Sequence, residues 1–131
     1  MIRTINSNLI ADEKNFNGRI YSSDEITAAL AKLKWRIERL GPIPGVLGYP
    51  ESVTDLDKIS HLVHEAALVD SQVQASVQFL DTPSGILMRT LFEAMPKRII
   101  MGSRGYGNVQ PDGHVTDFQI ITFDAILDED E

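Results

Sequence analysis

The sequence predicts an α+β fold in which two helices are interspersed among strands. Two segments carry apolar residues at the three- and four-residue spacing of a helix, and the middle and end of the chain alternate as half-buried strands do. Clusters of Gly, Pro and Asp separate these segments, and no repeat or shift of composition marks a second unit. We therefore expect residues 1–126 to form one domain and residues 127–131 to form an acidic tail.

The first helix is expected from Ser22 to Leu40. Ser22 followed by Glu25 is typical of a capping box, in which the serine hydroxyl accepts a hydrogen bond from a free backbone N–H of the first turn. Gly41 and Pro42 provide the stop. The residues expected on the inward stripe are Ile26, Leu30, Leu33, Ile37 and Leu40.

The second helix is expected from Pro83 to about Met95. Thr82 is a good N-cap, proline suits the first helical position, and Pro96 ends the helix. The residues expected to face inward are Ile86, Leu87, Leu91 and Met95.

Strands are expected in the rest of the chain. Residues 72–80 alternate strictly between apolar and polar side chains, and residues 59–69 pair with them as a hairpin around Asp70 and Ser71. Residues 115–126 form a third strand, and residues 99–101 lead into a glycine-rich loop. Residues 41–50, rich in Gly and Pro, are expected to be a loop.

Composition excludes several classes of function. The chain has 131 residues, no cysteine and a net charge of -7, so disulfides and thiolate metal sites are excluded and nucleic acid is an unfavourable partner. It contains no apolar run long enough to cross a membrane and no apolar signal segment near Met1. We expect no cofactor, no metal and no membrane association.

The most informative motif is the segment from Gly102 to Gly107, with a lone serine, Ser103, among three glycines. It occurs in order with four other motifs, which are Asn17–Tyr21, Gly48-Tyr49-Pro50, Leu80–Gly85 and Asp117–Asp124. Together these motifs resemble the prohead core proteases of tailed bacteriophages, serine peptidases that trim scaffold and capsid proteins and are similar in fold to herpesvirus assembly proteases.

The resemblance implies a small, mostly antiparallel β-barrel flanked by helices. It also implies phage capsid or scaffold proteins as partners, and a place in the prohead or virion, assembled in the host cytoplasm. A homo-oligomeric form is an open alternative.

The resemblance also implies where a catalytic triad would lie. The family's histidine base precedes a proline, and that position is Tyr49 here, whose phenol has a pKa of about 10 and is a poor base at neutral pH. The family's nucleophile opens a Ser-Ser-Arg-Gly segment, and its position is Gly102. Only the acidic member is kept in type, as Asp117. The resemblance therefore predicts a head-morphogenesis protein that binds its partners without peptidase activity.

A working maturation protease is the main alternative. It would use Ser103 as nucleophile with His61 or His64 as base, and the two histidines, three residues apart on a strand, point to opposite faces. His61 is better explained as a strand histidine that is satisfied by local hydrogen bonds. A metal site at His61, His64 and Glu65 is disfavoured by the same geometry.

Arg104 and Gly105 are the candidate binding residues beside the serine. The guanidinium either orients water or an oxyanion, or braces the segment through an acidic partner such as Asp117. Two further interpretations stay open. Tyr49 or Gly102 could have been introduced to silence an active enzyme, and the chain could be an acidic adaptor domain unrelated to the family.

Overall fold

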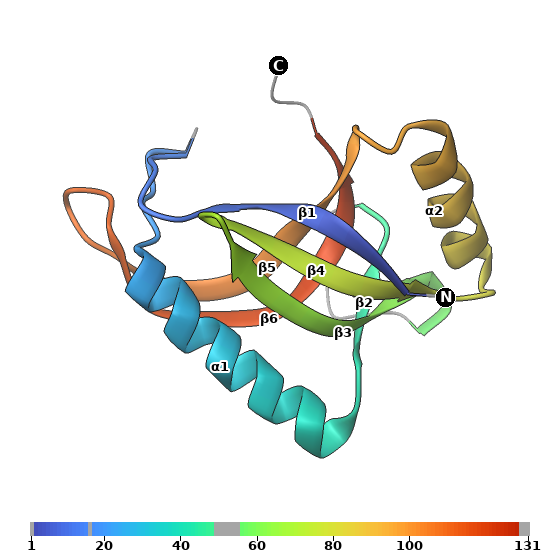
Figure 1. The fold of residues 1–131 in the computed structure, drawn as a ribbon, viewed down its shortest axis with the longest axis horizontal. Coiled ribbons are helices and arrows are strands. Elements are labelled where there is room, and N and C mark those ends of the chain that lie inside the picture. Colours follow the sequence, from blue (N-terminus) through green and yellow to red (C-terminus); the bar gives the residue numbers. More distant parts are fainter. Residues whose placement is uncertain (1, 16, 49–55, 129–131) are drawn as a thin grey trace.

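The structure is a computed structural model that describes residues 2–15, 17–48 and 56–128. Six strands and two helices follow one another along the chain (Figure 1), with a short 3-10 turn, η1, at Leu56–Lys58. The elements are β1 (Ile2–Ile10), α1 (Ser23–Leu40), β2 (Ile43–Val46), β3 (Ile59–Val69), β4 (Gln72–Phe79), α2 (Pro83–Ala94), β5 (Ile99–Val109) and β6 (Val115–Leu127).

The strands form one sheet in the order β2-β3-β4-β1-β5-β6, and the sheet curls until its two edges nearly meet. All neighbouring strands are antiparallel except β1 and β5, which pair in parallel at Ser7 and Met101. The edges are joined at a parallel bridge between Leu47 and Ala125, where Gly48 N donates to Ala125 O at 2.7 Å. The predicted α+β fold with a mostly antiparallel barrel is thus confirmed.

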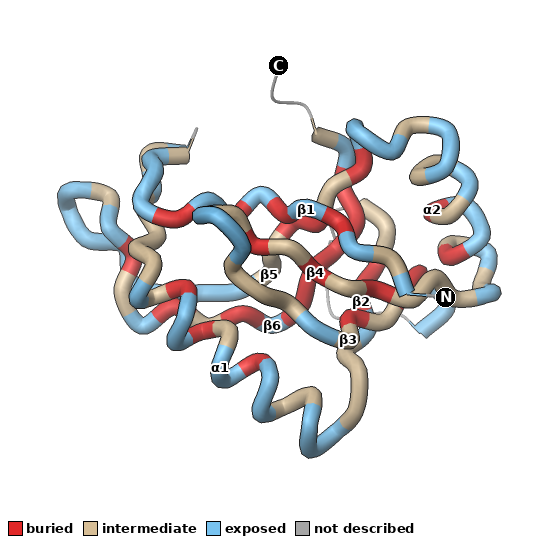
Figure 2. Tube along the Cα trace, viewed as in Figure 1, coloured by how far each residue is buried: buried red, intermediate tan, exposed pale blue. Residues whose placement is uncertain are grey.

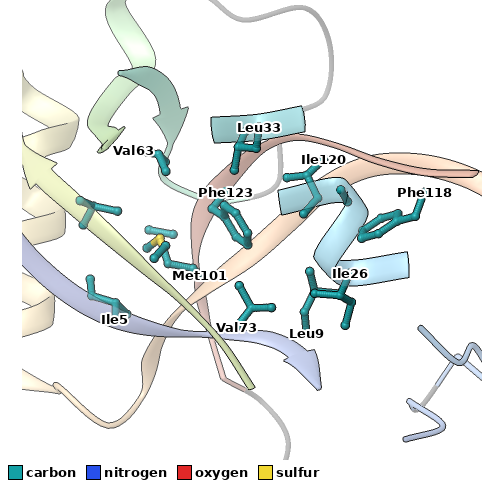
Figure 3. Close-up of a cluster of buried hydrophobic side chains, with 14 of the residues drawn as sticks. Ile5, Leu9, Ile26, Leu33, Val63, Val73, Met101, Phe118, Ile120 and Phe123 are labelled. Atoms are coloured by element: carbon teal, nitrogen blue, oxygen red, sulfur yellow. The ribbon is translucent and has the colours of Figure 1, made fainter. Parts of the chain in front are cut away.

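Helix α1 covers the part of the barrel wall that β2 leaves open. Strand β2 is only 4 residues long, so β3 and β6 lack a strand between them over much of their length. Helix α1 packs against both strands there and buries Ile26, Ala29 and Leu33. Figure 3 shows Ile26 and Leu33 among core side chains of β6 that include Phe123, the largest fully buried side chain.

The helix ends form as the sequence predicts. Ser22 Oγ accepts a hydrogen bond from Glu25 N at 3.2 Å, and Thr82 Oγ accepts one from Gly85 N at 3.0 Å. Gly41 has a φ of 89° and its N–H donates to Ile37 O, which closes α1. No helix in the described ranges is long and apolar enough to span a bilayer.

Three of the residues predicted to face inward are exposed instead. Leu40 is 84% exposed because it lies at the last position of α1, beyond the barrel wall. Helix α2 rests on β3 and β4 through Gly85 and Met88, so Ile86 and Leu87 lie on its outer side. The contact at Gly85 is close because the carbonyl oxygens of Leu80 and Ser60 lie where a Cβ atom would be.

Three strand assignments also differ from the sequence prediction. Strand β1 was not predicted, β2 falls in the segment expected to be a loop, and the expected glycine-rich loop is the continuous strand β5. The glycines of β5 allow a close approach to β6, since a Cβ atom on Gly105 would collide with the Gln119 carbonyl oxygen. The hairpin between β3 and β4 is confirmed, with positive φ at Asp70 and Ser71.

Candidate functional site

The predicted site residues of β5 lie around a shallow depression of about 320 Å³. It opens where β5 runs between β1 and β6. The residues that line it are Asn8, Gly102, Ser103, Arg104, Gly105, Asp124 and Ile126.

A buried carboxylate joins the strands around the depression. Asp124 is only 4% exposed, and its two oxygens accept hydrogen bonds from Arg104 Nε at 2.9 Å and Nη2 at 3.0 Å. The same side chain accepts a hydrogen bond from Val46 N at 3.0 Å. Asp124 therefore ties β5, β6 and β2 together with three charge-assisted hydrogen bonds. Arg104 does brace the segment, but its partner is Asp124 and not Asp117.

Gly102 lies directly opposite Asp124 in the β5–β6 pairing. A Cβ atom on Gly102 would lie 2.8 Å from Cδ1 of Ile126, the flexible end of that side chain. A small side chain at position 102 therefore requires only a shift of Ile126. In this chain the position offers no functional group to the depression.

Ser103 is held by its backbone. Its N–H donates to Asn8 Oδ1 at 3.2 Å, and its Cα partner on β6 is Phe123. Within the described ranges the Ser103 hydroxyl makes no hydrogen bond, so no base activates it there.

His61 is fully buried with both ring nitrogens in hydrogen bonds. Nε2 lies 2.7 Å from Phe123 O, and because a carbonyl only accepts, this nitrogen carries the proton. Nδ1 then accepts from Ser60 Oγ at 2.8 Å. Burial lowers the pKa of His61, partly offset by the hydrogen bond to Phe123 and by the charge of Asp124, so the ring is neutral.

The structure does not bring Ser103, His61 and Asp117 together. His61 reaches Phe123 from the β2 side, where Gly45 lies against both groups, whereas Ser103 pairs with Phe123 from β5. The backbone of β6 therefore separates the imidazole from the hydroxyl. Asp117 lies near the start of β6, with a φ of 53°, and accepts a hydrogen bond from Asn108 Nδ2 at 3.3 Å.

The remaining candidates for a base are no closer to a catalytic arrangement. His64 is half-buried and its Nε2 pairs with Gln78 Oε1 at 2.8 Å. Tyr49, at the family's histidine position, lies outside the described residues. No group of three His, Cys, Asp or Glu side chains within the described ranges is arranged to hold a metal ion.

Sequence reasoning missed the carboxylate that the site contains. Asp124 is the single charged residue in the apolar run Ile120–Ile126, and a carboxylate buried in such a run needs a cationic or N–H partner. That pattern by itself indicates a buried ion pair. Its partner Arg104 follows only from the strand register.

This barrel, with one helix over the gap between β3 and β6 and a second helix on β3 and β4, has the fold of a phage capsid assembly protease. One solved structure with this fold is described as the bacteriophage T4 capsid assembly protease, gp21, and the alignment has a TM-score of 0.74 and 20% sequence identity. It covers 95% of this chain and 79% of that chain. No protein-family model and no curated protein matches the sequence. The chain therefore has a prohead protease-like fold, as its motifs predict.

Proposed function

We propose that this chain is a phage head-morphogenesis protein that uses a prohead-protease fold to bind capsid or scaffold proteins, without peptidase activity. The domain predicted over residues 1–126, whose last strand β6 extends to Leu127, carries this role in the prohead or virion. The observation that carries the proposal is Gly102, which faces the buried pair of Arg104 and Asp124 and offers no side chain for attack.

The chemistry of acyl transfer supports the absence of cleavage. A serine nucleophile needs a base within hydrogen-bond reach of its hydroxyl, and a group that orients the base. Both nitrogens of His61 are engaged elsewhere, and β6 stands between that ring and Ser103. Tyr49, where the resemblance places the base, has a phenol that stays protonated at neutral pH.

The edge of β5 supports binding of an extended peptide. Within the described residues β1 pairs with β5 only at Ser7 and Met101, and residues 105–109 are exposed. Their outer backbone groups are therefore open to a further strand. A capsid or scaffold segment that adds to this edge would gain main-chain hydrogen bonds and place a side chain in the neighbouring depression.

Incubation with the capsid and scaffold proteins encoded beside this chain tests the lack of cleavage. We expect no specific fragments from the wild type. The matched control is the double variant Tyr49→His with Gly102→Ser, which introduces the family's base and nucleophile. The serine at position 102 can be accommodated because Ile126 can move aside. Specific cuts by the wild type that disappear in Ser103→Ala would refute the proposal.

Calorimetric titration with peptides from the same partner proteins tests the binding role. We expect at least one peptide to bind, and N-methylation of alternate backbone nitrogens to abolish binding in one of the two registers. Equal binding of both methylated forms would exclude strand addition, and no binding by any peptide would remove the binding role itself.

An active maturation protease is the second candidate function. It is favoured by the activity of the T4 protein with the same fold, and by Ser103, which lines the depression. This function requires that assembly moves Ser103 toward a base. It predicts labelling of Ser103 by a fluorophosphonate in assembled particles, and absence of labelling in every assembly state would exclude it.

A further inference from the structure

A second feature, which shares no residue with the depression at Gly102, lies on the exposed surface of helix α1. Lys32, Trp35, Arg36 and Arg39 recur at the spacing of one helical stripe and, with Leu40 at the helix end, form what we call the α1 patch. The stripe runs beside the buried face of α1, with Arg36 half-buried at the boundary, and Figure 2 shows the outer side of the helix as largely exposed.

The cations of the α1 patch are not neutralised within the described part of the chain. Lys32, Arg36 and Arg39 form no ion pair with any acidic side chain of the described ranges. This contrasts with the net charge of -7, which provides many acidic side chains for pairing. Three such cations in one stripe of an acidic protein produce a local positive potential, which attracts an anionic partner.

The patch is also partly preorganised. Arg36 is half-buried and its Nη2 donates to Ile121 O at 2.6 Å, which fixes the side chain across to β6. The Arg39 guanidinium lies 4.4 Å from the ring centroid of Trp35, a cation–π contact. Fixed aromatic and arginine side chains lose little conformational entropy on binding, which is why they dominate the energy of many interfaces.

An apolar depression adjoins the cations. It measures about 300 Å³ and is lined by Arg36, Leu40, Gly41, Pro42, Ile43 and Pro44. Trp35 is 58% exposed and Leu40 is 84% exposed, so a large apolar surface meets the charges here. A partner that covers the α1 patch therefore needs carboxylates together with an apolar side chain.

We propose that the α1 patch is a docking surface for an acidic protein segment that carries an apolar anchor residue. Its carboxylates pair with Lys32, Arg36 and Arg39, and its anchor covers Trp35 and enters the depression beside Leu40. This proposal does not rest on the proposed function, because it uses none of the residues of the β5 site.

Two physical arguments favour an acidic protein segment over nucleic acid or a lipid surface. The cations span a single helical stripe, and the rest of the protein is acidic, so an extended polyanion would be repelled wherever it left the patch. A short acidic segment contacts the patch alone. The exposed apolar surface at Leu40 also suits a side chain, whereas a phosphate backbone gains nothing from it.

Trp35 is the only tryptophan of the chain, so its fluorescence reports from within the patch. In the free protein we expect iodide to quench it about sevenfold more strongly than caesium, relative to their efficiencies on free tryptophan, because a local potential of one kT enriches the anion about threefold and depletes the cation by the same factor. Adding a short peptide of Glu, Asp, Leu and Phe should shift the emission to the blue and protect it from iodide. The peptide should dissociate as salt is raised.

The deciding variant is Lys32→Glu with Arg39→Glu, which should weaken peptide binding at least about tenfold and reverse the preference for iodide. Its matched control is Lys14→Glu with Lys97→Glu, which makes the same change of net charge at two exposed lysines elsewhere and should leave both readings unchanged. Equal loss in the two variants would overturn the proposal, since only net charge would then matter.

Other occupants are distinguished in the same assay. Oligothymidine and vesicles of anionic lipid are tested for their protection of Trp35 from iodide. If either protects Trp35 at a lower concentration than the peptide does, the proposal is overturned in favour of that partner. Concentration-dependent self-association in sedimentation that is lost in Lys32→Glu with Arg39→Glu would do the same, because the patch would then be covered by a second copy. Failure of any of these tests leaves the β5 proposal unaffected.

Discussion

Replacing Asp124 by asparagine is expected to destabilise the fold by about 3 kcal/mol. The carboxylate is buried and receives three hydrogen bonds, two from Arg104 and one from Val46 N. The side chain of Arg104 is itself only 25% exposed, so removing the negative charge leaves a guanidinium that water solvates poorly. Breaking a buried pair from one side costs about 3–5 kcal/mol, and asparagine recovers part of this through its remaining acceptor oxygen.

Urea denaturation measures this cost, provided that the slope of the transition is the same in both proteins. The matched control is Asp81→Asn, whose pair with Arg89 is 3.6 Å long with side chains 41% and 90% exposed, and which should change stability by less than about 1 kcal/mol. The double variant Arg104→Met with Asp124→Leu should be more stable than Asp124→Asn, because it leaves no unpaired charge. Equal small losses in Asp124→Asn and Asp81→Asn would show that the Arg104–Asp124 pair contributes no more than an exposed ion pair.

Three further predictions concern the backbone and the buried histidine. Gly102→Ala should destabilise the protein by no more than about 1 kcal/mol, whereas Gly105→Ala should cost more than about 3 kcal/mol or prevent folding. Only the Cβ atom at position 105 meets backbone, and thermal unfolding of the two variants measures the difference. Because burial lowers the pKa of His61 below 6.5, the unfolded state binds a proton first as the pH falls. Stability should therefore be fully present above pH 6.5 and decline below it by at most about 1.4 kcal/mol per pH unit. Urea titrations between neutral and mildly acidic pH should show this decline in the free energy of unfolding in the wild type and equally in His64→Gln. An NMR titration of the wild type in which the pKa of His61 is at or above the ordinary histidine value would contradict this prediction. Ser22→Ala should cost about 1 kcal/mol by removing the cap of α1, and no change in the unfolding midpoint would count against the capping role.

The helices and the central hairpin could be predicted because their signals are local. Ser22 and Thr82 cap the helices in the structure as they do in the sequence pattern, and the strict alternation of β4 reflects one buried face. Strand β1 gave no such signal, since one of its inward positions is Ser7, which is buried but polar and accepts a hydrogen bond from Leu9 N.

The candidate site could not be predicted in full because it depends on register between distant strands. The glycines of β5 indicate a loop unless it is known that β6 passes close to them. The partner of Arg104 is decided by the pairing of β5 with β6, which places Asp124 opposite Gly102 and leaves Asp117 near the other end of the strand. Gly102, where the family resemblance puts the nucleophile, is one of the residues that line the depression.

In this prohead protease-like fold Gly102 offers no attacking side chain, and none of the residues in the described ranges places a base beside Ser103. The most direct test is the intact mass of the protein after exposure to a fluorophosphonate, alone and in assembled particles, with the Tyr49→His and Gly102→Ser double variant alongside. We expect an unmodified wild type in both conditions. A stoichiometric adduct on the wild type that maps to Ser103 would contradict it.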